Sequence, residues 1–166
     1  APGVTVANVS EVFDHYEEGS FEPVFADATT LGNTQALSAN YRRLRYVRIG
    51  SLVHISGYIG LDSLGSMTSS NGIYLRGLPF TVAGNIPGSG DGFYRVPVHL
   101  GLVYGVQISQ TTLLSQIEGD LQYGTTYMTI RKRSVINTNI SMTENLTVGE
   151  FSNNGFFTMS AQYVCQ

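Results

Sequence analysis

The sequence predicts an all-β protein, folded as a jelly-roll-like antiparallel β-sandwich, and three observations support this class. Apolar and polar residues alternate with a period of two through much of the chain, whereas helical periodicity is almost absent. Short candidate strands recur at intervals of roughly 8–12 residues, which is typical of sandwiches and barrels. Clusters of Gly, Asn, Asp and Ser, the residues that form tight turns, lie between these candidate strands.

The clearest element is a hairpin in residues 46–58. Val47 and Ile49, followed by Leu52 or Val53 and then Ile55, alternate around Gly50-Ser51, as expected for two strands joined by a two-residue turn. Further strands are predicted at residues 72–75, 81–83, 100–108, 123–131, 137–141 and 156–164. Turns are expected between them at residues 65–66, 71–72, 87–92, 119–120 and 153–155.

Two stretches leave the secondary structure open. Residues 111–118 read TTLLSQIE and could form one or two turns of helix, although we favour a strand or loop. Residues 31–44 are polar and irregular, which fits a long connection or a short helix at 35–39. No repeat or low-complexity tract interrupts the pattern. We therefore expect a single sandwich domain over residues 16–166, with residues 1–15 as a connecting segment from an upstream shaft or module.

The composition limits the classes of partner. Only 13% of residues are charged, against a typical value of about 25%, so the surface of a monomer would be neutral enough to favour association. The net charge of −3 argues against a nucleic-acid binder, which needs clustered Lys and Arg. No apolar run approaches the ~20 residues of a membrane span, so membrane insertion is not expected. The single cysteine, Cys165, cannot form an internal disulfide.

The search for catalytic groups finds no constellation, so we expect no enzyme, no metal and no cofactor. The sequence has no G-x-S-x-G elbow, no H-x-x-x-H or C-x-x-C spacing and no EF-hand loop. His54 and His99 alternate with apolar neighbours, which places them on the solvent or interface face of strands. Because the chain has twelve acidic residues, spacing alone does not exclude a carboxylate pair suited to glycoside cleavage. A small glycan hydrolase or esterase therefore stays a minor hypothesis.

The best candidate for ligand contact is the loop at residues 84–95. Asp91, Phe93, Tyr94 and Arg95 could form a sugar site, because an aromatic face stacks on a pyranose ring while polar groups bond its hydroxyls. Loops on a rigid sandwich often carry recognition. The simpler alternative, which we favour, is a surface loop whose aromatics pack into the core.

Two basic clusters also have two interpretations. They are Arg42-Arg43-Leu44-Arg45 with Arg48, and Arg131-Lys132-Arg133. Guanidinium groups could bind an acidic glycan or phosphate through bidentate contacts. We favour the alternative, in which these side chains pair with acids between subunits or remain as solvated charge that protects a sheet edge.

Three segments resemble the C-terminal domains of tailed-phage tail fibres and tailspikes. Residues 13–23, FDHYEEGSFEP, are similar to the DxYEEGTWTP opening of these domains, and residues 46–57, YVRIGSLVHISG, to their YxKIGxxVxxxG hairpin. The third segment, residues 77–80, matches the GLPF that follows. In addition to these three, residues 156–164 are similar to the closing GxxxxxxxY strand. The motif residues, for which we favour a structural role, are Tyr16, Glu17, Glu18, Gly19, Phe21, Pro23, Tyr46, Ile49, Gly50, Val53, Gly57, Gly77, Leu78, Pro79 and Phe80.

The resemblance implies a domain that binds rather than catalyses. It implies a homotrimer at the tip of a tail fibre or tailspike in the virion, contacting a host-surface glycan or another receptor. The alternative is a monomeric carbohydrate-binding module of a larger polysaccharide-degrading enzyme.

Physical roles can be expected for several motif residues. Gly19 and Gly50 would supply a positive φ or a tight turn. Tyr16 and Phe21 could close one end of the sandwich. Pro79, which lacks an N–H donor, should mark an edge or the start of a strand.

Overall fold

Antiparallel strands make up almost all the regular structure of the chain. A computed structural model describes residues 15–30, 32–37, 39–84, 95–107, 113–136 and 139–166, and its one helical segment in these ranges is a 3₁₀ turn at Val148–Glu150. The strands are β1 (Tyr16–Phe21), β2 (Val24–Ala26), β3 (Ala36–Leu37), β4 (Leu44–Ile49), β5 (Leu52–Ser63), β6 (Tyr74–Arg76), β7 (Arg95–Val106), β8 (Leu113–Gln122), β9 (Tyr127–Ile136), β10 (Asn139–Asn145) and β11 (Phe151–Val164).

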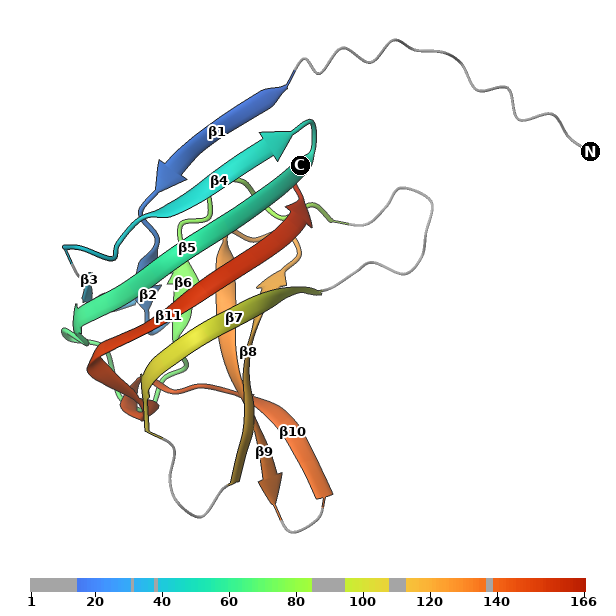
Figure 1. Cartoon of the computed structure of the whole chain (residues 1–166). Coiled ribbons are helices and arrows are strands. Elements are labelled where there is room, and N and C mark those ends of the chain that lie inside the picture. Colours follow the sequence, from blue (N-terminus) through green and yellow to red (C-terminus); the bar gives the residue numbers. More distant parts are fainter. Residues whose placement is uncertain (1–14, 31, 38, 85–94, 108–112, 137–138) are drawn as a thin grey trace, which may run out of the picture.

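One continuous sheet curls over itself to form the sandwich (Figure 1). Its strand order is β1-β4-β5-β11-β7-β8-β9-β6-β2, with β10 beside β9 and β3 beside β5. Strand β7 joins the two halves, because its residues 95–98 pair with β8 and its residues 99–106 pair with β11. We call β1-β4-β5-β11-β7 the front layer and the remaining strands from β8 to β2 the back layer. The predicted all-β, antiparallel sandwich class is confirmed.

The hydrophobic core fills the space between the two layers. Phe25 of β2 is fully buried, and its ring lies 5.7 Å from that of Phe157 and 6.0 Å from that of Phe151, both on β11. Because β2 lies at the far end of the sheet order from the front layer, this contact closes the curl. Other buried members of the core are Val53, Ile55, Ile59, Leu75, Leu121, Met128, Ile130, Met159 and Tyr163.

The predicted hairpin is confirmed, but its apolar residues do not all point into the core. Ile49 lies opposite Leu52 across the Gly50-Ser51 turn, and Gly50 has a φ of +59°, which side chains rarely adopt. On β5, Val53 and Ile55 point into the core as expected. On β4, however, Ile49 is 42% exposed and points outward.

Several strand and turn predictions are corrected by the structure. The predicted turn at 119–120 lies within β8, and the one at 153–155 lies within β11, where Asn154 has a φ of +61° and the pairing register shifts, as in a bulge. The predicted strand at 81–83 reduces to a single bridge between Val82 and Cys165. Pro79 lies in a bend and starts no strand.

The two open stretches and two predicted boundaries are also settled. From Leu113 onward, the TTLLSQIE stretch belongs to β8, in line with the favoured interpretation. The residues considered for a short helix contain the two-residue strand β3 instead. The strand predicted to start at 100 begins at Arg95, and the one predicted to start at 123 begins at Tyr127.

The three motif segments meet around Tyr46. Gly19 of β1 lies opposite Tyr46, and a Cβ atom on Gly19 would lie 2.8 Å from its ring and hydroxyl, so glycine leaves room for the Tyr46 ring and does not supply the predicted positive φ. The Tyr46 hydroxyl donates a 2.7 Å hydrogen bond to Glu17, which raises the pKa of Tyr46. Its ring packs edge-on against Phe80 at 5.3 Å and lies 6.4 Å from Phe21. The opening, the hairpin and the GLPF segment thus form one cluster.

Two further contacts tie Phe80 into the front layer. The Arg48 guanidinium lies 4.7 Å from the centre of the Phe80 ring, a cation–π distance, and the Tyr163 hydroxyl donates to the Phe80 carbonyl at 3.2 Å. Phe21 packs against the core, but Tyr16 is 58% exposed on the outside of the sheet. The prediction that Tyr16 closes one end of the sandwich is therefore wrong.

Asp27 joins the end of β2 to two loops. It is 5% exposed and accepts hydrogen bonds from the backbone N–H groups of Thr68 at 2.8 Å and Asn33 at 2.7 Å. The bond from Thr68, assisted by Asn33, holds the pKa of Asp27 below its usual value despite burial.

The Asp27→Asn variant should lose about 2 kcal/mol of stability at neutral pH, because the bonds to a charged acceptor are weakened. The native pKa is lowered, so the stabilisation is present above the unfolded pKa of about 3.9 and is lost as the pH falls through the native pKa. The difference between wild type and variant, measured by urea unfolding, should shrink below about pH 4. A difference that is constant with pH would contradict a charge-based role.

The Phe25→Ala variant should lose about 3–5 kcal/mol of unfolding free energy, since it removes the ring that closes the curl. Tyr123→Ala, at a residue 40% exposed in the turn after β8, is the control and should change stability little. Urea denaturation at a fixed protein concentration measures both, and equal losses would show that the Phe25 contact does not close the sandwich.

Candidate functional site

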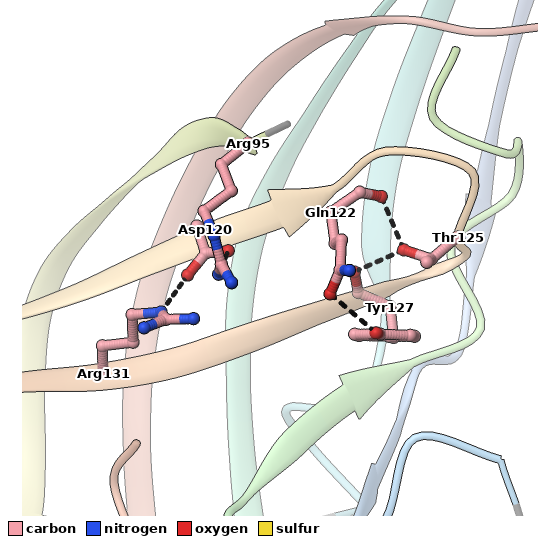
Figure 2. A network of polar contacts seen from close by, with 6 residues as sticks. All are labelled: Arg95, Asp120, Gln122, Thr125, Tyr127 and Arg131. Carbon is pink, nitrogen blue, oxygen red and sulfur yellow. Dashed lines mark hydrogen bonds and ion pairs between the residues drawn. The ribbon is translucent and has the colours of Figure 1, made fainter. Parts of the chain in front are cut away.

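Only one of the four predicted ligand residues lies in the described structure. Asp91, Phe93 and Tyr94 lie outside the described residues, whereas Arg95 begins β7. Figure 2 shows that Arg95 points toward Asp120 of β8, which also meets Arg131 of β9. The structure therefore joins one predicted residue to two that the sugar-site hypothesis did not include.

Asp120 holds two arginines at the point where the sheet curls. Its side chain is 11% exposed, and one carboxylate oxygen accepts from Nη1 of Arg95 while the other accepts from Nε of Arg131. The three residues come from three adjacent strands, β7, β8 and β9. Together with Pro97 and Glu118 they line a hollow of about 310 Å³.

The ion pairs of Asp120 with Arg95 and Arg131 join three neighbouring strands, and we call these three residues the Asp120 clamp. Each oxygen of Asp120 accepts a hydrogen bond from a different guanidinium group. Such charge-assisted bonds are the strong class of hydrogen bond, and here they join β7 of the front layer to the back layer. We assign the cluster a structural role.

Next to the clamp, uncharged residues form hydrogen bonds between the end of β8 and the start of β9 (Figure 2). The Thr125 hydroxyl donates to the Gln122 carbonyl at 2.6 Å, and the Tyr127 hydroxyl donates to Oε1 of Gln122 at 2.9 Å. Burial, and then the neighbouring Tyr74, raise the pKa of Tyr127, so its hydroxyl stays a donor. These bonds set the β8–β9 turn.

The basic clusters form ion pairs within the chain. On β9, Lys132 pairs with Glu150, and Arg133 lies 3.9 Å from Glu118. Burial would raise the pKa of Glu150, but the hydrogen bonds from Lys132 and Thr147 outweigh it and lower that pKa. The favoured interpretation was pairing with acids between subunits or solvated charge at a sheet edge, whereas the acidic partners seen here belong to the same chain.

The first basic cluster shares a single acid. Arg42 and Arg43 both reach Glu22, with distances from Nε to the carboxylate of 3.4 and 2.8 Å. The hydrogen bond from Arg43 lowers the pKa of Glu22, so the acid stays ionised. Two guanidinium groups thus meet one carboxylate.

The outward side of the front layer, which we call the outer face, carries exposed apolar side chains in register. Tyr16 lies opposite Ile49, Ile49 opposite Leu52, and Leu52 opposite Val164. Their exposed fractions are 58%, 42%, 47% and 51%, respectively. We call these four residues the apolar row. Sequence reasoning missed it, because the row exists only once four strands are in register.

The centre of the outer face has no formal charge. Residues 52–60 of β5, 99–104 of β7 and 156–164 of β11 contain no Asp, Glu, Lys or Arg. His54 and His99 lie there as predicted and line a hollow of about 570 Å³ together with Ser160 and Gln162. The outer side of the back layer, in contrast, carries the Asp120 clamp and the ion pair between Glu118 and Arg133.

Four aromatic rings form a continuous line at the other end of the outer face. Ring centres are separated by 4.5 Å from Tyr41 to Tyr58, by 5.1 Å from Tyr58 to Phe156, and by 5.0 Å from Phe156 to Tyr104, where the rings stack. We call these residues the aromatic ladder. The sequence did not single out these residues, because they lie in four separate segments and become neighbours only in the folded sheet.

Metal, thiol and membrane chemistry add no further site to the described part of the chain. Among the described residues, no group of three or more His, Cys, Asp or Glu side chains could hold a metal ion. Cys165 is a free, buried thiol. Within the same ranges, no helix has the length and apolar character needed to cross a bilayer.

Comparison with known proteins identifies the fold. No protein-family model matches the chain, and no curated protein matches it in sequence. The chain is similar in structure to the Dettilon tailspike protein (gp208), whose crystal structure it matches with a TM-score of 0.62 at 12% sequence identity. The match covers 91% of this chain and 24% of the tailspike chain, so the chain spans about a quarter of that protein. The sandwich is thus a fold present in a phage tailspike.

The Asp120→Asn variant should lose about 2 kcal/mol of stability, since it leaves two guanidinium groups facing a neutral amide. Glu118→Gln is a matched control on the same strand and the same hollow, and it should change stability little because its pair with Arg133 is longer, at 3.9 Å. Urea midpoints measure both variants. Equal effects would contradict the assignment of Asp120 as the clamp.

Proposed function

We propose that this chain is a tip domain of a phage tail fibre or tailspike, which assembles as a homotrimer in the virion and binds a glycan on the host surface. On this proposal it recognises the host without cleaving the glycan. The fold shared with a tailspike and the three ordered sequence motifs support a place in the phage tail.

The proposal that the chain associates rests on the outer face of the front layer. Apolar patches of this kind on a soluble domain mark contacts with another protein, a ligand or a membrane. Interface centres are poor in charged residues, and the middle of this face has none. The outer side of the back layer has ion pairs instead, so the two sides of the sandwich differ in the way expected when one side faces other subunits.

The apolar row is the part of this face best suited to a second copy of the chain. Three of its members, Ile49, Leu52 and Val164, are aliphatic, and all four are 42–58% exposed in the single chain. Covering these side chains would remove apolar surface from water, at roughly 25 cal/mol per Å². Hydrophobic burial would therefore stabilise association.

Light scattering during gel filtration should give a mass three times the 18.0 kDa of one chain. Leu52→Asp should weaken association by at least about tenfold, because it would bury an unpaired carboxylate within the contact. Val24→Asp, at a residue 38% exposed on β2 of the back layer, is the matched control and should keep the trimer. A wild-type mass of one chain at every concentration would overturn the trimer.

Glycan binding is tested on an array of bacterial surface polysaccharides. Defined binding by a trimer would support the proposal. Binding by a stable monomer would favour a carbohydrate-binding module instead, and release of oligosaccharides from a bound polysaccharide would indicate an enzyme.

A further inference from the structure

Each ring of the aromatic ladder contacts the next one, so the four rings form one continuous surface. Tyr41 and Tyr104 at its ends are 50% and 60% exposed, and the contacts to Tyr58 and Phe156 link them without a break. Gly60 lies opposite Phe156, and a Cβ atom there would lie 3.4 Å from the Cβ of Phe156 and 3.6 Å from that of Tyr41. Because Gly60 has no side chain, both Phe156 and Tyr41 can pack close to the strand at this position.

The face of an aromatic ring is electron-rich, whereas the C–H groups on the flat side of a pyranose are electron-poor. A line of rings therefore offers stacking positions to successive sugars of a chain. Tyrosine hydroxyl groups at the rim can also bond to sugar hydroxyls. Aliphatic side chains offer no comparable directional contact.

A polar hollow adjoins one end of the ladder. It has a volume of about 390 Å³ and is lined by Ala39, Asn40, Tyr41, Arg42, Arg43 and Tyr58. The rings of Tyr41 and Tyr58 thus belong both to the ladder and to the hollow.

The charge of this hollow favours an anion. Arg42 and Arg43 share Glu22 through their Nε atoms, and within the described ranges no other ion pair engages either guanidinium. One carboxylate against two guanidinium groups leaves an excess positive charge. The terminal nitrogens of arginine fit a carboxylate in a bidentate arrangement. A carboxylate on a sugar could therefore pair with the terminal nitrogens of these arginines.

The two ends of the outer face therefore suit different partners. The apolar row is mostly aliphatic and fits another subunit, as proposed above. The ladder combines aromatic rings, hydroxyl groups and an arginine pair, and these groups fit a saccharide that carries a carboxylate.

We infer that the aromatic ladder and the Arg42–Arg43 hollow form one binding site for an acidic oligosaccharide, with the rings stacking on successive sugars and the arginines binding a sugar carboxylate. This inference rests on the proposed function and names its site and its class of ligand.

The test uses isothermal titration of the whole chain with oligogalacturonate and oligomannuronate, and with neutral malto- and cello-oligosaccharides of the same length. The acidic probes should bind more tightly than the neutral ones. Tyr41→Ala and Tyr104→Ala should each weaken binding on the order of tenfold. Tyr123→Ala, at an exposed tyrosine in the turn after β8, is the control and should bind like wild type.

Arginine variants separate the charge from the stacking. Arg42→Gln should reduce the preference for acidic over neutral probes, while Arg133→Gln, which has a similar side-chain exposure of 43% on β9, should leave it unchanged. All five variants replace exposed side chains, and their melting temperatures should match that of the wild type.

Three results would overturn the inference: equal binding of acidic and neutral probes, no binding of either, or unchanged binding by the ladder variants. A loss of trimer mass in Tyr104→Ala would assign the ladder to a subunit contact and would also overturn it. These failures differ from failure of the proposed function. A trimer that binds array polysaccharides through another surface would refute this site alone, whereas a monomer that binds no glycan would refute both.

Discussion

The contact between Phe25 and the phenylalanines of β11 is the constraint on which the rest of the structure depends. An antiparallel sheet has two faces, and a curled sheet buries one of them only if its far strands meet. Phe25 on β2 reaches Phe151 and Phe157, and so brings the end of the back layer onto the middle of the front layer. Once this face is buried, the pleat sends every alternate side chain of β5 and β11 outward. The composition of the outer face follows from that division.

The motif segments have a clear architectural role within this frame. Tyr46 contacts Gly19, Glu17 and Phe80, so it joins β1 and the hairpin to the segment after β6. The resemblance to phage fibre domains therefore rests on residues that hold the front layer together. This supports the structural interpretation of the motifs and explains why they do not reveal a ligand. On the proposed function, recognition would come from side chains outside the motifs, such as those of the ladder.

Charge is distributed unevenly between the two sides of the sandwich, and this unevenness connects the fold to the proposed function. The clamp at Asp120 and the ion pair between Glu118 and Arg133 lie on the back layer, where they neutralise one another. The centre of the outer face has no formal charge, and its two ends differ: one is aliphatic, and the other is aromatic with arginines beside it. On the proposed function and the further inference, the aliphatic end would contact other copies of the chain and the aromatic end would bind a saccharide.

The sequence by itself determined the features that depend on neighbouring residues. Period-two alternation and turn residues were enough for the all-β class, for the hairpin and for its turn at Gly50, because the pleat and the backbone dihedrals are local properties. Only the tertiary structure decided which strands are neighbours. Local rules placed Gly119-Asp120 in a turn. They could not show that Phe80 lies beside Tyr46 and Arg48, or that Arg95 and Arg131 lie beside Asp120. The ladder was equally invisible, because its rings come from segments up to 115 positions apart, Tyr41 to Phe156, and become neighbours only through the pairing register. Register is set by the burial of the whole core, which no short segment contains.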